Sequence, residues 1–351
     1  MKRNADIDTV KGIGIFLVVF GHLNLQEPAQ TIIYSFHIPL FFVVSGLLFR
    51  RENFRGGKEF LVRRLRSLII PYLLFALATL AFYIGVQFLK TGFNDEFVQF
   101  AGKYITQVFI AQYSMVYGPN IPMWFVPCLF LTECIYFYIS SISNKAMRCI
   151  LVVIIVAFGW FTQSSFCRWD FSVLPWNFSG ACFALGFYAV GNMFLQKYGV
   201  LLKERYKGMH GYFKVLLFTV LFAVLFFLAE RNGHVSIGSR LFHNGFIFYA
   251  TGMLGTALVL MTALLADHNR FLRYWGKNSF LIMATHIVFY NILSGLVQAA
   301  GGDSLSDHRT SLVHSFAAIA AVMAACSIFS VVYNGLRKMK NRGLLFSRSA
   351  V

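Results

Sequence analysis

Two histidines lie inside hydrophobic segments of this chain, where ionisable side chains are costly. His22 lies inside the first such segment, and Lys11 precedes it with ten residues between them. His37 lies in the next hydrophobic segment. Because the bilayer interior penalises charge, ionisable groups at this depth mark proton relays and other functional sites. Two histidines at similar depth on neighbouring segments therefore indicate chemistry inside a membrane.

Helical geometry places Lys11 and His22 on one face. Eleven steps of about 100° make three turns plus about 20°, and the rise between the two residues is about 16 Å. Lys11 is then expected at the cytoplasmic edge and His22 well beyond the bilayer midplane. Asp8 lies about one turn before Lys11 on the same face and is expected to pair with it.

Three further residues within hydrophobic segments are candidates. Pro39 follows His37 and is expected to kink its helix and free the carbonyl near Ser35, which is tolerated where a helix lines a cavity. Glu133 stands near mid-bilayer and needs a partner, either a histidine that it orients or an arginine. His286 is a weaker candidate of the same type. For His37 alone, an ordinary hydrogen-bonded contact between helices remains an equal alternative.

A basic cluster lies just before the third hydrophobic segment. Arg63 and Arg66 are three residues apart, so they share a face if this stretch is helical. The forked guanidinium group suits bidentate phosphate recognition. The alternative is a purely topogenic cluster that fixes the orientation of the chain.

The elements that must position these residues are membrane helices. Of the 351 residues, 58% are hydrophobic and 13% are charged, against about 25% charged in soluble domains. The apolar residues form blocks of roughly 17–25, the length of a spanning helix. We therefore predict an all-α, polytopic helix bundle in a lipid bilayer. About ten transmembrane helices are expected, at roughly 10–26, 31–50, 67–90, 122–141, 147–166, 173–195, 212–230, 244–266, 278–299 and 311–335.

The distribution of basic residues supports this topology. With both termini in the cytoplasm, the cytoplasmic segments hold about 24 Lys and Arg and the outer segments about 6. The net charge of +17 is thus explained by orientation and contact with anionic lipid, and we expect no nucleic-acid partner. We predict one membrane domain, 1–336, and a short basic cytoplasmic tail, 337–351. The outer segment 91–121 carries an amphipathic stretch that either lies on the interface or re-enters the bundle.

A metal site is not expected. The histidines show neither HxxxH nor HExxH spacing, and few acidic residues lie within spans. The six cysteines show no CxxC spacing, and they are interpreted as small packing residues.

Taken together, these residues resemble the integral-membrane acyltransferase family three over nearly the whole chain. Lys11 and His22 match the family's Arg/Lys-x10-His motif, and Arg63 and Arg66 match its RxxR motif. The N-terminal part, which includes His37-Ile38-Pro39, looks most like the fucose 4-O-acetylase-type branch. The resemblance implies transfer of an acyl group, usually acetyl, from cytoplasmic acyl-CoA to a hydroxyl of a cell-envelope saccharide, free or lipid-linked. The implied location is the bacterial inner membrane, crossed many times.

The resemblance also implies roles. Acetyl-CoA would be the donor, with its phosphates at Arg63, Arg66 and Lys11, and its pantetheine arm would follow the first helix to His22. His22 would act as general base on the acceptor hydroxyl, with an acetyl-histidine intermediate as the alternative. Asp8 would hold Lys11, while His37 and Glu133 would orient the base or the acceptor.

Two other classes of function remain open from the sequence. The histidines and Glu133 could form the relay of a proton-coupled transporter of a sugar or another small molecule. A non-catalytic membrane sensor that binds acyl-CoA or polysaccharide is the third class. The two family motifs and the absence of an internal repeat favour the enzyme.

Overall fold

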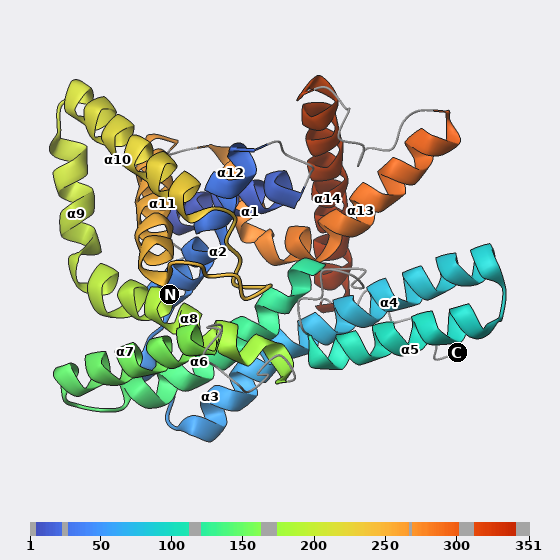
Figure 1. Ribbon diagram of the computed structural model, residues 1–351, viewed down its shortest axis with the longest axis horizontal. Helices are drawn as coiled ribbons and strands as arrows, with labels where there is room; N and C mark the ends of the chain where they lie inside the picture. Colours follow the sequence, from blue (N-terminus) through green and yellow to red (C-terminus); the bar gives the residue numbers. More distant parts are fainter. Residues whose placement is uncertain are drawn as a thin grey trace. The chain divides into compact units, whose positions relative to one another are not determined.

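The computed structural model describes residues 5–22, 27–111, 121–162, 174–266, 269–301 and 312–341. Within these ranges the chain is helical, and the only β pairing is an isolated bridge between Ser236 and Leu241. This confirms the predicted all-α membrane bundle (Figure 1). The helices form two compact units, which are described separately below.

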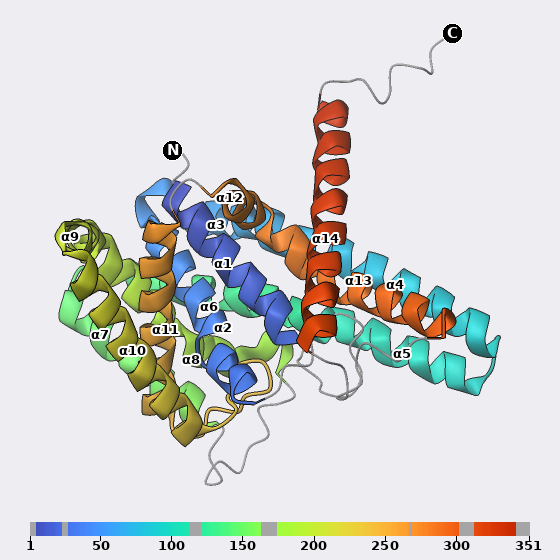
Figure 2. The same cartoon turned by 90° about the horizontal axis from the view of Figure 1, so that it is seen from above.

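The first unit comprises Met1–Leu25 and His268–Val351. Its helices are α1 (Ala5–His22), α12 (Arg270–Lys277), α13 (Ser279–Ala299) and α14 (Leu312–Asn341). α12 lies beside α1 in both views of the ribbon (Figures 1 and 2). α14 continues as a helix past Leu336, where the basic tail was expected to begin, and residues 342–351 of that tail lie outside the described part of the chain.

The second unit is Gln26–Asp267. Its α-helices are α2 (Ala29–Leu48), α3 (Gly57–Arg64), α4 (Ile70–Thr91), α5 (Asp95–Ile110), α6 (Phe125–Ser140), α7 (Lys145–Phe161), α8 (Phe178–Ala189), α9 (Gln196–Gly208), α10 (Gly211–Asn232) and α11 (Gly245–Leu265). Three short 3₁₀-helices, η1 (Arg51–Asn53), η3 (Ile121–Trp124) and η5 (Pro175–Asn177), precede or connect them.

Eight helices in the described ranges are long and apolar enough to cross a membrane. The other two predicted spans correspond to α1 and α7. α1 has 18 residues but carries Asp6, Asp8 and Lys11, and α7 has only 17 residues. The lipid-facing character of α10 is plain from its exposed side chains, which include Phe213, Leu216 and Val220.

Two of these helices are longer than predicted because π-helical turns join separate α-helices. η2 (Leu65–Ile69) connects α3 to α4, giving a 35-residue helix that begins at Gly57 rather than near 67. The turn ends two residues before Pro71, whose ring nitrogen cannot donate a backbone hydrogen bond. η6 (Val190–Leu195) connects α8 to α9 in the same way. Such π-turns often lie at functional sites.

The second π-turn secures the C-terminus of α2. Helix ends leave carbonyl groups without intrahelical partners. The side chain of Asn192 donates hydrogen bonds to the Gly46 and Phe49 carbonyls at 3.0 Å each, and Gln196 donates to the Phe49 carbonyl at 2.5 Å. Tyr136 of α6 donates to Asn192 Oδ1 at 2.7 Å. Three helices are thus fixed around the end of α2, where the basic segment 50–66 begins.

The amphipathic stretch predicted in segment 91–121 forms α5. Asn94 caps its N-terminus by accepting a hydrogen bond from the Phe97 N–H at 2.8 Å. α5 runs back along α4 as the second half of a helical hairpin (Figure 1). The Tyr72 hydroxyl donates to the Val108 carbonyl at 2.7 Å and ties the two helices together. Residues 112–120 lie outside the described part of the chain.

Candidate functional site

α1 holds Asp8, Lys11 and His22 on one uninterrupted helix, as predicted. Asp8 is buried, with 5% of its surface exposed, and Lys11 and His22 are partly exposed. The expected pairing of Asp8 with Lys11 stays a prediction. The other predicted site residues, which lie in the second unit, are His37, Glu133, Arg63 and Arg66.

Two glycines allow α12 to lie directly against the first turns of α1. A Cβ atom on Gly12 would fall 2.0 Å from the Leu272 carbonyl oxygen, and one on Gly276 would fall 1.7 Å from that of Asp8. No larger residue fits at these distances, so the backbones touch. This stretch lies between the predicted spans 244–266 and 278–299. The structure makes it a short basic helix next to Asp8 and Lys11.

The Nδ1 atom of His22 lies 2.7 Å from the Val18 carbonyl oxygen, one turn earlier in α1. Because a carbonyl can only accept, Nδ1 carries the hydrogen of the neutral ring, and the lone pair is on Nε2. The same arrangement holds for His37 with the Ile33 carbonyl at 2.7 Å, and for His286 with the Met283 and Ile282 carbonyls at 2.9 and 3.0 Å. In this tautomer, Nε2 is the atom that can take a proton from a hydroxyl.

His22 meets His286 within the first unit. Their ring centroids are 5.3 Å apart, and the ring planes are inclined at 78°. His286 is 2% exposed. From the sequence His286 is only a weaker candidate, because nothing in the sequence shows that α1 and α13 bring the two rings together.

Pro39 lies inside α2, and the kink expected there stays a prediction. Proline at position 39 removes the hydrogen bond that the Ser35 carbonyl would accept within α2. The Thr251 hydroxyl of α11 lies 3.5 Å from the Ser35 carbonyl oxygen, while it lies 3.0 Å from the Phe248 carbonyl oxygen of its own helix. α2 continues through Pro39 to Leu48.

His37 is buried beside a second aromatic group. Its ring centroid lies 5.0 Å from that of Tyr34, which in turn lies 4.6 Å from that of His234. Burial lowers the pKa of His234, with a smaller opposing effect from the Glu27 carboxylate. His234 lies between the predicted spans 212–230 and 244–266. The structure places its ring, uncharged at neutral pH, within one cluster with His37.

Glu133 pairs with an arginine, one of the two alternatives expected for it. Its Oε2 atom lies 2.8 Å from Nε of Arg64, and the two side chains are 5% and 25% exposed respectively. The Arg64 guanidinium also lies over the rings of Phe54 and Phe60, at 5.6 and 5.9 Å from their centroids. Arg64 was not among the predicted site residues, although the residues on either side of it belong to the same basic run.

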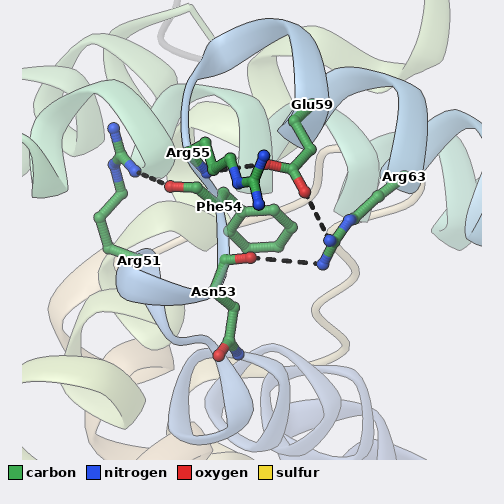
Figure 3. A network of polar contacts seen from close by, with 6 residues as sticks. All are labelled: Arg51, Asn53, Phe54, Arg55, Glu59 and Arg63. Carbon is green, nitrogen blue, oxygen red and sulfur yellow. Dashed lines mark hydrogen bonds and ion pairs between the residues drawn. The ribbon is translucent and has the colours of Figure 1, made fainter.

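Arg63 and Arg66 are exposed on the helical segment that replaces the predicted loop. Arg63 forms an ion pair with Glu59 at 2.5 Å and donates to the Asn53 carbonyl at 3.3 Å (Figure 3). The other oxygen of Glu59 accepts from the Arg55 backbone N–H at 2.8 Å. η2 begins at Leu65, between Arg63 and Arg66. The two arginines are therefore not related by regular α-helical spacing, from which their shared face was expected.

Nearby, Arg51 folds over the Phe137 ring at 4.1 Å and donates to the Phe54 carbonyl at 2.8 Å. The basic segment is therefore an ordered surface of the second unit. Within this segment, Glu59 partly neutralises the charge of Arg63, whereas Arg64 forms an ion pair with Glu133.

Comparison with known families defines the class of protein. A family model described as an acyltransferase domain, that of acyltransferase family three, matches residues 4–331. The chain therefore belongs to this family of membrane acyltransferases, as its sequence motifs indicated. No curated protein and no solved structure matches the chain.

Proposed function

We propose that the protein is an O-acetyltransferase that moves an acetyl group from cytoplasmic acetyl-CoA to a hydroxyl of a cell-envelope saccharide. The observation that carries the proposal is the 2.7 Å contact between His22 Nδ1 and the Val18 carbonyl oxygen, which assigns the ring hydrogen to Nδ1. In a chain of an acyltransferase family, a membrane histidine eleven residues after Lys11 presents Nε2 as a proton acceptor. The O-antigen and capsule are acceptors of this class, and the fucose 4-O-acetylase-type resemblance favours a sugar.

His22 acts as general base in this proposal. The acceptor oxygen attacks the thioester carbonyl carbon while its proton passes to Nε2 of His22, and a C–O bond forms. The C–S bond then breaks, and Nε2 gives the proton to the departing CoA thiolate. A positioned base contributes about 10²–10⁴-fold to such a step. An acetyl-histidine intermediate is the alternative route and requires Nε2 as the nucleophile.

The donor phosphates are assigned to Arg63, Arg66 and Lys11. Both arginines are exposed and carry forked donors, which favours phosphate binding. Glu59 competes with a phosphate group for Arg63, so Arg66 is the more available of the two for phosphate binding. The basic helix α12 beside Lys11 adds positive charge on the same side of the predicted topology.

Asp8, His37 and Glu133 receive supporting roles. Asp8 holds Lys11, and His37 helps to orient the acceptor. The ion pair with Arg64 shifts the proposed role of Glu133 away from orienting a histidine and toward holding the basic segment in place. The excess of basic residues in the inner segments supports insertion in the bacterial inner membrane with both termini in the cytoplasm.

Radiolabelled acetyl-CoA tests the proposal. Membrane vesicles that contain the protein should transfer label to an envelope saccharide, and vesicles with His22→Ala should not. If the protein is instead a proton-coupled transporter of a sugar, it will move the unmodified sugar across the vesicle membrane and leave no label on any glycan.

A further inference from the structure

The helix α9 of the second unit is exposed along most of its length, and its exposed side chains are of two kinds. Residues 200–202, which are Val, Leu and Leu, expose 73%, 51% and 46% of their surfaces. Lys197, Arg205 and Lys207 are exposed on the same helix. Water disfavours the first kind and hydrocarbon disfavours the second. Both kinds are accommodated together at the boundary between lipid tails and headgroups.

The length of the helix that contains α9 places it outside the hydrocarbon core. α8, η6 and α9 form one continuous helix of 34 residues that ends at Gly208. At 1.5 Å per residue this helix is about 51 Å long, whereas the hydrocarbon core is about 30 Å thick. The start of α9 is fixed at the end of α2, because Gln196 donates a hydrogen bond to the Phe49 carbonyl. α9 therefore begins where α2 leaves the membrane.

α9 does not stand upright in the cytoplasm. If it did, its 13 residues would carry the start of α10 about 20 Å away from the hydrocarbon. α10 instead exposes apolar side chains from its first turns, among them Phe213, Val215 and Leu216, as lipid-facing helices do. α9 is seen nearly end-on in Figure 2, whereas α10 crosses the same view, so the two helices run in different directions. α9 thus lies along the membrane surface, which is the cytoplasmic one in the predicted topology.

The junction between α9 and α10 marks the depth of this surface. Lys214 Nζ donates a hydrogen bond to the Lys207 carbonyl at 3.0 Å and lies 5.5 Å from the centroid of the Tyr206 ring. The exposed ring of Tyr212 stacks with that of His210 at 5.8 Å between centroids. Tyrosine is enriched at the level of the lipid headgroups. The junction therefore lies at the depth of the lipid phosphate groups.

We propose that α9 is an interfacial helix that binds the phosphate headgroups of anionic phospholipids in the cytoplasmic leaflet. Its basic side chains are those of Lys197, Lys203, Arg205 and Lys207. Glu204 is its one acidic side chain, so four basic groups and one acidic group give the helix a charge of +3. Clusters of basic residues beside a membrane span bind anionic lipid in this way. The inference goes beyond the proposed acetyl transfer and does not depend on it.

Two matched double variants test the proposal. Arg205→Gln with Lys207→Gln removes two exposed positive charges from α9. Arg337→Gln with Lys338→Gln removes the same two types of side chain from the exposed end of α14, which is also cytoplasmic in the predicted topology. The full-length protein in detergent is titrated with phosphatidylglycerol and, separately, with phosphatidylcholine of the same acyl chains. Native mass spectrometry measures the bound lipid.

We expect the wild type to prefer phosphatidylglycerol to phosphatidylcholine. The α9 variant should bind phosphatidylglycerol about 5- to 30-fold more weakly, because each basic residue near the surface contributes roughly fivefold. The α14 variant should bind it as the wild type does. Equal binding by the wild type and the α9 variant, or an equal loss in the α14 variant, would overturn the proposal. Displacement of phosphatidylglycerol by acetyl-CoA or inorganic phosphate at equal concentration would assign the site to a soluble phosphate and contradict the proposal.

Hydrogen exchange gives a second measurement that needs no variant. The wild-type protein is placed in nanodiscs of phosphatidylcholine alone and of an equal mixture of phosphatidylcholine and phosphatidylglycerol. Backbone amides of residues 196–208 should exchange more slowly in the mixture, because headgroup binding stabilises α9 against local opening. Amides of α5 are the control and should exchange equally in both, since α5 carries two acidic side chains and one basic side chain. Equal exchange of α9 in the two lipids would show that it does not bind anionic headgroups.

Discussion

The Nε atom of Arg64 lies 2.8 Å from Oε2 of Glu133, and this ion pair joins the basic segment to the interior of α6. A carboxylate in mid-span is costly without a partner, and Arg64 provides one. The stacked rings of Phe60 and Phe137, with centroids 4.2 Å apart, pack in the same region. Arg64 thereby anchors the segment that presents Arg63 and Arg66.

Glu133→Gln should destabilise the protein strongly. Removing one partner of a buried ion pair costs about 3–5 kcal/mol, and we expect the lower end because Arg64 is 25% exposed. Thermal unfolding of the purified protein in detergent measures the loss. Glu59→Gln is the control, because it breaks the exposed pair with Arg63, for which we expect a much smaller change in stability since solvent screens exposed pairs. Equal stability losses in the two variants would show that the Glu133–Arg64 pair contributes no more to stability than the exposed Glu59–Arg63 pair.

His22→Ala should abolish acetyl transfer by a protein that still inserts and folds. The expected loss is about 10²–10⁴-fold in kcat, because the base is removed. His22→Gln should be equally inactive, since an amide can accept a hydrogen bond but cannot take the proton. Initial rates with labelled acetyl-CoA, normalised to folded protein, give the comparison. A well-folded His22→Ala variant with near-normal turnover would remove His22 from the mechanism.

Arg63→Ala and Arg66→Ala should weaken the binding of acetyl-CoA. For exposed charges we expect about 1 kcal/mol each, or roughly a fivefold increase in Kd. Glu59→Gln provides the opposite change, because it frees Arg63 and should tighten binding or leave it unaltered. Equilibrium binding of labelled CoA measures the effect.

The orientation of the chain should persist in both arginine variants, because at least five other basic residues remain in that segment. Protease accessibility of the termini serves as the check. Unchanged affinity for acetyl-CoA in both variants would return the cluster to a topogenic role.

Local features of this fold could be predicted from the sequence. Apolar blocks of spanning length predicted most of the helices, because backbone groups in lipid must be satisfied within a helix. The chemistry of Pro39 likewise predicted the freed Ser35 carbonyl. The approach of Thr251 to this carbonyl could not be predicted, because the packing of α2 against α11 is a long-range contact.

The candidate site shows the same division. The one-face relation of Lys11 and His22 is a local property of a helix, and α1 is continuous over both residues. The partner of Glu133 and the meeting of His22 with His286 depend on tertiary packing. The emphasis on Arg63 and Arg66 assumed regular α-helical spacing, and the π-turn that begins at Leu65 breaks it.

The measurement that tests the central claim most directly concerns sidedness. Sealed inverted vesicles expose the cytoplasmic face, so labelled acetyl-CoA is added outside and an impermeant saccharide acceptor is enclosed in the lumen. We predict that label appears on the enclosed saccharide with the wild type and not with His22→Ala, because the basic cluster lies inside and His22 nearer the outer face in the predicted topology. If label appears only when donor and acceptor share the cytoplasmic side, transfer does not cross the membrane and the account is wrong.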